Sequence, residues 1–464
     1  MERSNYVSTT NACKLCKPLG ACLAFKGIEG AVPMLHGSQG CATYMRRYII
    51  SHFREPMDIA SSSLGEKHAV YGGGPNLKQG LRNIMTKYGA RLIGVATTCL
   101  TETIGDDVPM IVKEFKKEMG ESGLHDLPAL VTVSTPSYSG THMEGFHAAV
   151  RAVVEQVSSN EDSAHILNLL PGFLSPEDLR YLKEITDDFW YPSVILPDFS
   201  MTLDGPALTD CEKIPGGGTP IEDIRRMGGA TATFEFGSTL ADFNSAGKFL
   251  RDRFGVPLHQ MGIPIGLRET DVFFDALERL SGTACPEKYV LEKGRLIDSY
   301  VDAHKYLFGK RAVVYGEEDL VVGLTSFLSE VGITPVLCAT GGKSGHFKTA
   351  IERVTEGIAP PAAGPEGSSA VQPPAVYEGM DFQQIEELAL QLSPDLLIGH
   401  SKGYPLSKKL GIPLIRVGFP IHDRFGAQRI LHVGYRGTQS LLDLIVNSIL
   451  EAHQDDSPVG YAYM

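Results

Sequence analysis

The sequence predicts an α/β fold of three Rossmann-like domains, each with a parallel sheet flanked by helices. Short apolar or β-branched runs alternate with helix-length amphipathic segments along nearly the whole chain, an order typical of βαβ units. The 464 residues are enough for about three domains of ordinary size. The 50 glycines favour many tight turns at strand ends, where α/β proteins build their sites.

We expect an N-terminal α/β domain over residues 1–160, a second over 161–300, and a third over 301–464 that ends in a helix. The predicted strands are Leu92–Ala96, Ala129–Val133, His165–Leu170, Ser193–Leu196, Ala230–Glu235, Arg311–Tyr315, Thr334–Cys338, Leu396–Ile398 and Pro413–Val417. The predicted helices include Ala21–Ile28, Asn76–Tyr88, Val108–Lys117, Met143–Ser158, Ser175–Asp188, Glu317–Val331 and Thr438–His453. In such sheets, ligands bind beyond the carboxyl ends of the strands.

Two segments interrupt this alternation of strands and helices. Thr202–Asp223 is rich in Gly and Pro, and we interpret it as a surface loop. Glu356–Gln372 contains many Ala, Pro, Gly and Ser residues, which cannot bury a core, so we expect an extended insertion there.

Composition excludes several classes of protein. A hydrophobic fraction of 43% and a charged fraction of 21% are those of a globular protein. No run of eighteen apolar residues occurs and the start does not resemble a signal peptide, so we expect a cytoplasmic protein without a membrane segment. The net charge of −13 argues against a nucleic-acid surface, which needs clustered Lys and Arg.

Three short stretches each place a cysteine in a Gly- or Thr-rich bend. Cys16 lies before Pro18 and Gly20, Cys41 ends His-Gly-Ser-Gln-Gly-Cys, and Cys99 follows two threonines. These cysteines are spread over more than eighty residues, too far apart for a local zinc knuckle. Soft thiolate ligands select iron–sulfur clusters or zinc, so the pattern indicates metal–sulfur chemistry.

The remaining cysteines have plainer interpretations. Cys13 and Cys16 form a CxxC, but a zinc ribbon would need a second CxxC and the chain has none. Cys16 is expected near a helix N-terminus, where the dipole stabilises a thiolate, whereas Cys13 is interpreted as a bystander. Buried small hydrophobes are expected at the other positions, namely Cys22, Cys211, Cys285 and Cys338.

With these residues in view, the chain resembles the β-type subunit of nitrogenase component 1. The resemblance rests on Cys-x-Pro-x-Gly from Cys16, on the stretch at 36–41, and on Thr-Thr-Cys-x-x-Glu-x-Ile-Gly-Asp-Asp at 97–107. It continues in Ser-Thr-Pro-Ser-Tyr-Ser-Gly-Thr-His at 134–142 and Gly-Phe-Pro-Ile-His-Asp-Arg at 418–424. The matching motifs run from near the N-terminus almost to the C-terminal helix.

The resemblance implies a cofactor and its ligands. In the family, the β-type subunit gives three cysteines to a bridging [8Fe-7S] P-cluster, and the α-type subunit gives three more. The matching residues here are Cys16, Cys41 and Cys99. A serine ligates the oxidised cluster in some members, and Ser137 matches it; a turn hydroxyl that caps a helix is the alternative for Ser137.

The resemblance also implies partners and an activity. The chain would be a nitrogenase-like oxidoreductase subunit in an α2β2 heterotetramer with an α-type subunit that holds the active-site metal cofactor. An ATP-dependent [4Fe-4S] reductase protein would supply electrons. Nucleotide hydrolysis would belong to that protein, because this chain has no Gly-x-x-x-x-Gly-Lys-Ser/Thr loop. The expected role is electron relay for reduction of dinitrogen or of a small carbon–sulfur substrate such as a methylthio-alkane.

Two other interpretations stay open. A cofactor-assembly scaffold would carry a simpler [4Fe-4S] cluster, and Gly399-His-Ser-Lys-Gly403 departs from the Gly-Asn-Ser stretch of standard β-subunits. A non-redox α/β binding protein would carry the cysteines incidentally. The chain starts only about fifteen residues before Cys16, without the long extension common in molybdenum β-subunits, and this favours a reductase other than the standard molybdenum enzyme.

Overall fold

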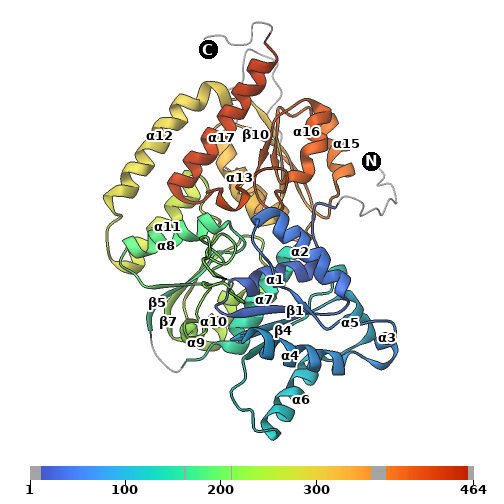
Figure 1. Cartoon of the computed structure of the whole chain (residues 1–464). Helices are drawn as coiled ribbons and strands as arrows, with labels where there is room; N and C mark the ends of the chain where they lie inside the picture. The colour runs from blue at the N-terminus through green and yellow to red at the C-terminus, as the bar shows by residue number, and fades with distance from the viewer. Residues whose placement is uncertain (1–11, 161–163, 211, 357–372, 458–464) are drawn as a thin grey trace. The chain divides into compact units, whose positions relative to one another are not determined.

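The computed structural model describes residues 12–160, 164–210, 212–356 and 373–457 (Figure 1). Within these ranges the strands form three sheets flanked by helices, which confirms the predicted α/β class. The chain divides into two compact units. The first unit comprises Leu15–Phe236 and Ala241–Gln260, and the second comprises Met1–Lys14, Gly237–Leu240 and Met261–Met464. The domain borders near residues 160 and 300 stay a prediction.

The first sheet has the strand order β2-β1-β3-β4, with all neighbouring strands parallel. Its strands are β1 (Ala31–His36), β2 (Ala60–Ser61), β3 (Leu92–Thr97) and β4 (Ala129–Val133). β3 and β4 begin at the predicted residues, whereas β1 was not among the predicted strands. Six consecutive buried residues in β1 and in β3 fit strands that are covered on both faces.

Helices cover both faces of this sheet (Figure 1). One face packs its apolar side chains against α4 (Gly74–Tyr88) and α6 (Val108–Glu121), with Phe115 at the centre of the cluster. The other face carries α1 (Lys17–Lys26) and α7 (His142–Val157), which pack closely on each other. The other helices along this stretch are α2 (Gln39–Phe53), α3 (His68–Tyr71) and α5 (Cys99–Ile104).

The second sheet, also in the first unit, has the order β6-β5-β7-β8, and β5 pairs in parallel with both β6 and β7. Its strands are β5 (Ala164–Leu170), β6 (Ser193–Ile195), β7 (Ala230–Phe236) and β8 (Leu258–Met261). The helices along this stretch are α8 (Pro176–Asp188), α9 (Ile221–Arg226) and α10 (Ala246–Phe254). α8 begins at the predicted position because Ser175 and Asp178 form a capping box.

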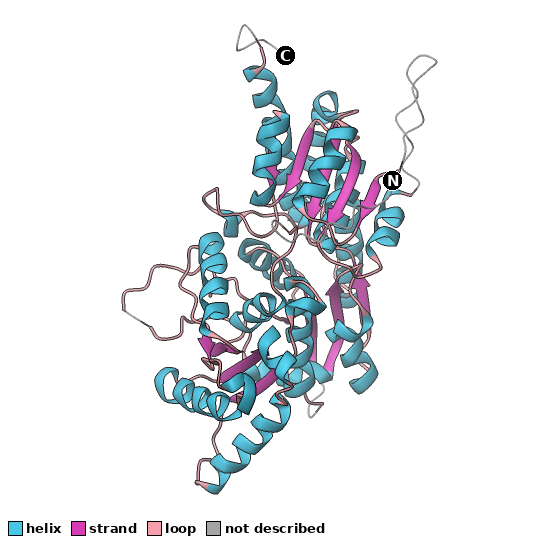
Figure 2. Ribbon diagram, turned by 90° about the vertical axis from the view of Figure 1, so that its right-hand side faces the viewer, coloured by secondary structure: helices cyan, strands magenta, loops and turns pink. Residues whose placement is uncertain are grey.

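The third sheet belongs to the second unit and has the order β11-β10-β9-β12-β13, all parallel (Figure 2). Its strands are β9 (Arg311–Gly316), β10 (Thr334–Thr340), β11 (Ala375–Tyr377), β12 (Leu396–Gly399) and β13 (Leu414–Arg416). The helices of this unit are α11 (Gly266–Ser281), α12 (Glu287–Leu307), α13 (Glu318–Glu330), α14 (Phe347–Thr355), α15 (Phe382–Leu392), α16 (Tyr404–Leu410) and α17 (Gly434–Asp455).

The predicted surface loop Thr202–Asp223 is wrong at its ends. Its last residues enter α9, and Thr202 and Thr219 are buried. Thr219 donates from its amide to the Gly27 carbonyl at 2.8 Å, so the glycine-rich segment packs against the turn between α1 and β1. The predicted insertion Glu356–Gln372 lies outside the described residues except for Glu356 itself.

No helix among the described residues has both the length and the apolar character needed to cross a membrane.

Candidate functional site

The parallel order of the first sheet brings three predicted site residues to one edge. β1 ends at His36 and is followed by α2, which contains Cys41; β3 ends at Thr97 and is followed at once by Cys99. β4 leads into a short 3₁₀ turn, η1 (Ser137–Ser139). Because β1, β3 and β4 are adjacent and parallel, their carboxyl ends meet at the same edge.

Cys16 reaches this edge through α1. The helix starts directly after Cys16 and connects to β1 by a short turn, so α1 runs back along the sheet and its N-terminus returns to the carboxyl edge. Contacts confirm this position: Leu15 donates its amide to His142 Nδ1 at 3.3 Å, and His142 donates its amide to the Leu15 carbonyl at 3.1 Å. Lys17 Nζ donates to Ser139 Oγ at 3.0 Å.

Each of the three cysteines therefore lies at the start of a helix. Cys16 is the N-cap residue of α1, Cys41 is in the first turn of α2, and Cys99 is the first residue of α5. The first peptide N–H groups of a helix have no partner within it and favour a negative charge. This location suits thiolates that bind metal.

Hydrogen bonds tie the three turns together. Thr98 donates from its amide and its hydroxyl to the His36 carbonyl, at 3.2 and 3.1 Å, which joins the β1 turn to the β3 turn. Ser137 donates its amide to Cys99 Sγ at 3.2 Å, which joins the β3 turn to the β4 turn. Hydrogen bonds thus connect the turns after β1, β3 and β4 to one another.

Glu102 strengthens the same connection and was given no role from the sequence. Its Oε1 accepts hydrogen bonds from Thr97 Oγ1 and Ser134 Oγ, both at 2.5 Å. Thr97 Oγ1 also accepts the Thr135 amide at 2.8 Å. The signal for this role was the glutamate three residues after Cys99, one helical turn into α5.

Two glycines allow the backbone to approach closely at this edge. A Cβ atom on Gly20 would lie 1.7 Å from the His142 carbonyl oxygen, because α1 and α7 touch there through their backbones. A Cβ atom on Gly37 would lie 2.3 Å from Thr98 Oγ1. Only glycine fits at either position, which explains physically why these bends are glycine-rich.

Both ring nitrogens of His36 are hydrogen-bonded to other side chains, so His36 is not a free ligand at the sheet edge that carries the cysteines. The buried imidazole bonds Asp106 Oδ2 through Nε2 at 3.0 Å and Ser62 Oγ through Nδ1 at 2.9 Å. Burial lowers the pKa of His36, and the Asp106 carboxylate opposes that effect. Asp107 caps α6 by accepting the Met110 amide.

Exposure separates the three candidate ligands from most of the other cysteines. Cys99 is exposed, and Cys16 and Cys41 are half-buried. Cys22 and Cys338 are buried as predicted, and burial raises the pKa of the Cys338 thiol to about 12. The prediction for Cys285 is wrong, since it is only half-buried, and Cys211 lies outside the described residues.

Charged and aromatic groups surround Cys16. Burial lowers the pKa of the neighbouring Lys17, while the carboxylates of Glu144 and Glu102 raise it. The pKa of Tyr44 on α2 is raised by burial, by the hydrogen bond with Tyr48, and by the charge of Cys16. Because the charge of Cys16 acts on Tyr44, the first turns of α2 lie near the start of α1.

The three candidate ligands share one chemistry and one sheet edge. No cluster of three or more His, Cys, Asp or Glu side chains within the described residues is arranged to hold a single ion. Instead, three soft sulfur donors stand on separate bends of one edge, and none of them is buried. Soft thiolate donors of this kind select iron–sulfur clusters or zinc.

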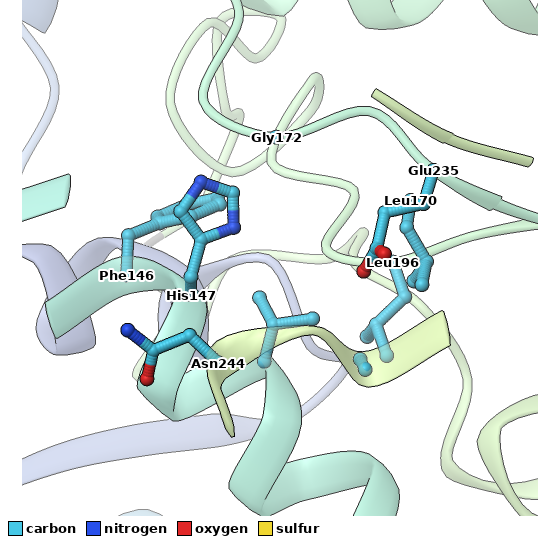
Figure 3. Close-up of a pocket in the computed structure, with 9 residues that line it drawn as sticks. Phe146, His147, Leu170, Gly172, Leu196, Glu235 and Asn244 are labelled. Atoms are coloured by element: carbon cyan, nitrogen blue, oxygen red, sulfur yellow. The ribbon is translucent and has the colours of Figure 1, made fainter. Parts of the chain in front are cut away.

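A small pocket lies at the carboxyl ends of β5, β6 and β7, and none of the three candidate ligands lines it (Figure 3). Its empty volume is about 240 Å³, and this figure includes space that is open to solvent. Glu235 in its wall instead accepts hydrogen bonds from Ser245 and Gly247 at the start of α10. Burial raises the pKa of Glu235. We assign no ligand to this pocket.

Comparisons with known proteins agree with this geometry. Residues 16–450 match the family described as nitrogenase component 1 type oxidoreductase. The nitrogenase molybdenum-iron protein beta chain of Methanothermobacter thermautotrophicus is 36% identical over 465 residues, covering 98% of this chain and 97% of that one. The nitrogenase vanadium-iron protein beta chain of Trichormus variabilis is 34% identical, covering 94% and 92%.

A solved structure, nitrogenase Cp1 at pH 6.5, matches with a TM-score of 0.93 and 32% identity over 99% of this chain and 98% of that chain. The M. thermautotrophicus relative is matched over nearly its full length, so the short region before Cys16 does not separate this chain from molybdenum-iron proteins. The family match and these relatives show that the chain is a β-type subunit of an oxidoreductase complex and belongs to the nitrogenase component 1 family.

Proposed function

We propose that this chain relays electrons within a nitrogenase-like reductase. Electrons would pass from an ATP-dependent [4Fe-4S] reductase protein, through a bridging [8Fe-7S] cluster, to a metal cofactor in the α-type subunit. The observation that carries the proposal is the convergence of Cys16, Cys41 and Cys99 on one sheet edge, each at a helix start and none buried. Cysteines that are exposed or half-buried at such an edge are available to a group shared with a partner.

In this proposal the three thiolates hold half of the cluster. When bound, the cluster supplies storage and transfer of electrons, with its potential set by hydrogen bonds to sulfur, burial and charge. The Ser137 amide donates a hydrogen bond to the sulfur of Cys99, and the Ser137 residue is half-buried. Thr98 and Glu102 keep the cysteine turns in place through their hydrogen bonds.

The partner follows from the incomplete donor set. Three cysteines leave a bridging cluster without its remaining ligands, so we infer an α-type subunit of similar fold that supplies them, in an α2β2 heterotetramer. The beta chains of molybdenum-iron and vanadium-iron proteins among the relatives support this partner. Relatives of both kinds match almost equally well. We propose as the substrate either dinitrogen or a small carbon–sulfur compound such as a methylthio-alkane.

Iron analysis tests the proposal. The complex of this chain with its α-type partner would be purified without oxygen from cells that cannot make the partner's own cofactor, so that only interface iron is counted. We expect about eight irons per αβ pair, in keeping with an [8Fe-7S] cluster. About four irons would favour a cofactor-assembly scaffold with a [4Fe-4S] cluster, and an iron-free complex would contradict both.

The substrate needs a separate assay. The complete complex, with its reductase protein, ATP and an electron donor, would be offered dinitrogen or a methylthio-alkane in parallel. Formation of ammonia identifies the first, and release of methanethiol identifies the second. A complex with eight interface irons that reduces neither compound would contradict the substrate part of the proposal and leave the relay part standing.

A further inference from the structure

The carboxyl edge of the third sheet holds a peptide of the chain itself. β10 lies on one side of β9 and β12 on the other, so the loops after β9 and β12 diverge and leave a crevice where α/β sheets ordinarily bind ligands. Residues that follow the strands border this place: Glu317 after β9, Gly341 after β10 and His400 after β12. The segment Ala12–Lys14 contacts several of these loops.

The backbone of this segment is paired like an added strand. The Cys13 amide donates to the Met380 carbonyl at 3.3 Å, and Ala12 forms an isolated antiparallel bridge with Asp381. A Cβ atom on Gly341 would lie 2.3 Å from the Cys13 carbonyl oxygen, so only glycine allows the peptide to lie this close. The contact is therefore built into the backbone of the loop after β10.

Cys13 fills the crevice with its side chain. It is 4% exposed and belongs to the apolar cluster that contains Val313, Tyr315 and Leu397 of the sheet. Its Sγ lies 3.7 Å from His400 Nε2. Burial is the main cause that raises the pKa of Cys13 to about 12, so the thiol is neutral at physiological pH. Cys13 is thus an anchoring side chain, whereas the sequence predicted a bystander.

Lys402 completes the contact from the loop after β12. Its ammonium donates to the Ala12 carbonyl at 2.8 Å and to the Lys14 carbonyl at 3.3 Å, and so bridges both sides of Cys13. Both His400 and Lys402 come from Gly399-His-Ser-Lys-Gly403, the segment in which β12 ends and the next turn begins.

We propose that Cys13, His400 and Lys402 anchor the peptide that leads to Cys16 and act as positioning residues for that cluster ligand. Only Leu15 separates Lys14 from Cys16, and their Cα atoms are at most about 7 Å apart, so fixing the Lys14 carbonyl restricts where the Cys16 sulfur can lie. The inference deepens the proposed electron relay and rests on it for the role of Cys16.

Hydrogen exchange measured on the complex of the full chain and its partner tests the anchor. In Lys402→Met, the peptide that contains residues 12–15 should exchange its amide hydrogens about tenfold faster or more, because two charge-assisted hydrogen bonds are lost. Lys402→Arg should restore slow exchange. Lys408→Met, an exposed lysine on α16, is the matched control and should leave exchange unchanged. Should Lys402→Met fail to fold, His400→Asn should show a smaller acceleration in the same direction.

Electron paramagnetic resonance and the midpoint potential of the interface cluster test the positioning role on the same variants. We expect a shifted potential and an altered signal in Lys402→Met, recovery in Lys402→Arg and no change in Lys408→Met. Faster exchange with an unshifted potential and signal would overturn the positioning role, and unchanged exchange would overturn the anchor. An iron-free wild-type complex would overturn the proposed function, and with it the role given to Cys16, while the exchange experiment still decides whether the anchor exists.

Discussion

The edges of the first and third sheets use one architecture in opposite ways. Both lie at the carboxyl ends of adjacent parallel strands, and both contain cysteine side chains. At the first edge, Cys99 is exposed and the other two candidate ligands are half-buried. At the third edge, Cys13 is buried, and the Ala12–Lys14 peptide occupies the place that a ligand would take.

This difference teaches that accessibility, more than residue type, decides what a cysteine can do at a strand end. The first edge keeps its sulfurs available by placing them at helix starts on turns that hydrogen bonds connect. The third edge surrounds its sulfur with apolar side chains, which disfavours a thiolate. The predictions below follow from this contrast.

Turnover should fall most when one accessible sulfur is removed. Cys41→Ala should lower reductive turnover by more than about 100-fold, beyond the loss typical of residues that only support a metal ligand. Turnover would be measured with the partner and the reductase protein present. Cys338→Ala is the control, and it should keep full turnover at a cost of about 1 kcal/mol in stability. Wild-type turnover by Cys41→Ala would contradict the assignment.

Thiol alkylation should separate the two kinds of cysteine by orders of magnitude. In the folded, iron-free chain at pH 8, Cys99 should react because it is exposed, whereas Cys13 and Cys338 should react at least about 1,000-fold more slowly. A pKa of about 12 leaves only about one thiol in 10,000 ionised at that pH. Mass spectrometry of each cysteine-containing peptide gives the rates. Unfolding in urea should remove the difference, and equal rates in the folded chain would contradict it.

A glycine pair tests how tightly the first edge is packed. Gly20→Ala should destabilise the chain by about 3 kcal/mol, because the new methyl group would collide with the His142 carbonyl. Gly120→Ala, in α6 with no neighbouring atom within 4 Å, should instead stabilise it by about 0.5 kcal/mol. Denaturant unfolding measures both changes. Equal stabilities of the two variants would show that α1 and α7 can separate at low cost.

The smallest effect concerns the buried carboxyl of Glu318 at the third edge. Burial raises its pKa from 4.5 to about 7, so the folded chain binds this proton more tightly than the unfolded chain does. The contribution of Glu318 to stability is therefore present below pH 4.5 and is lost as the pH rises toward about 7. Glu318→Gln should remove this dependence and gain about 2 kcal/mol at pH 8 relative to wild type. Parallel stability curves for the two chains between pH 5 and 8 would contradict the shifted pKa.

Much of the fold followed from the sequence because its strands are short, apolar and closed by distinctive turns. The predicted Ala129–Val133 matches β4, and Arg311–Tyr315 is one residue short of β9. β1 escaped prediction because Pro33 lies within it, and proline is unusual inside a strand. Pro33 is tolerated in β1 because the neighbouring strand β2 is short and pairs only with Met34 and Leu35.

Part of the candidate site could likewise be predicted from the sequence, and part of it could not. The bends at Cys16, Cys41 and Cys99 were visible because the cysteine and its flanking Gly or Thr residues are neighbours in sequence. Their roles as cluster ligands stay a prediction. The anchoring contact of Cys13 was not visible, because His400 lies 387 residues further along the chain and only the folded sheet brings it to Cys13. Local patterns reveal turns, whereas contacts of this range need the tertiary structure.

The hydrogen bond from position 137 to the sulfur of Cys99 comes from the main chain. This hydrogen bond therefore depends little on which amino acid occupies position 137. Alanine, glycine or threonine would keep the N–H donor, and proline would remove it. Evolution could thus exchange the hydroxyl at position 137 without losing the hydrogen bond from the peptide nitrogen to the Cys99 sulfur. Protein engineering could likewise change the hydroxyl group at position 137 or the main-chain hydrogen bond there, one without the other.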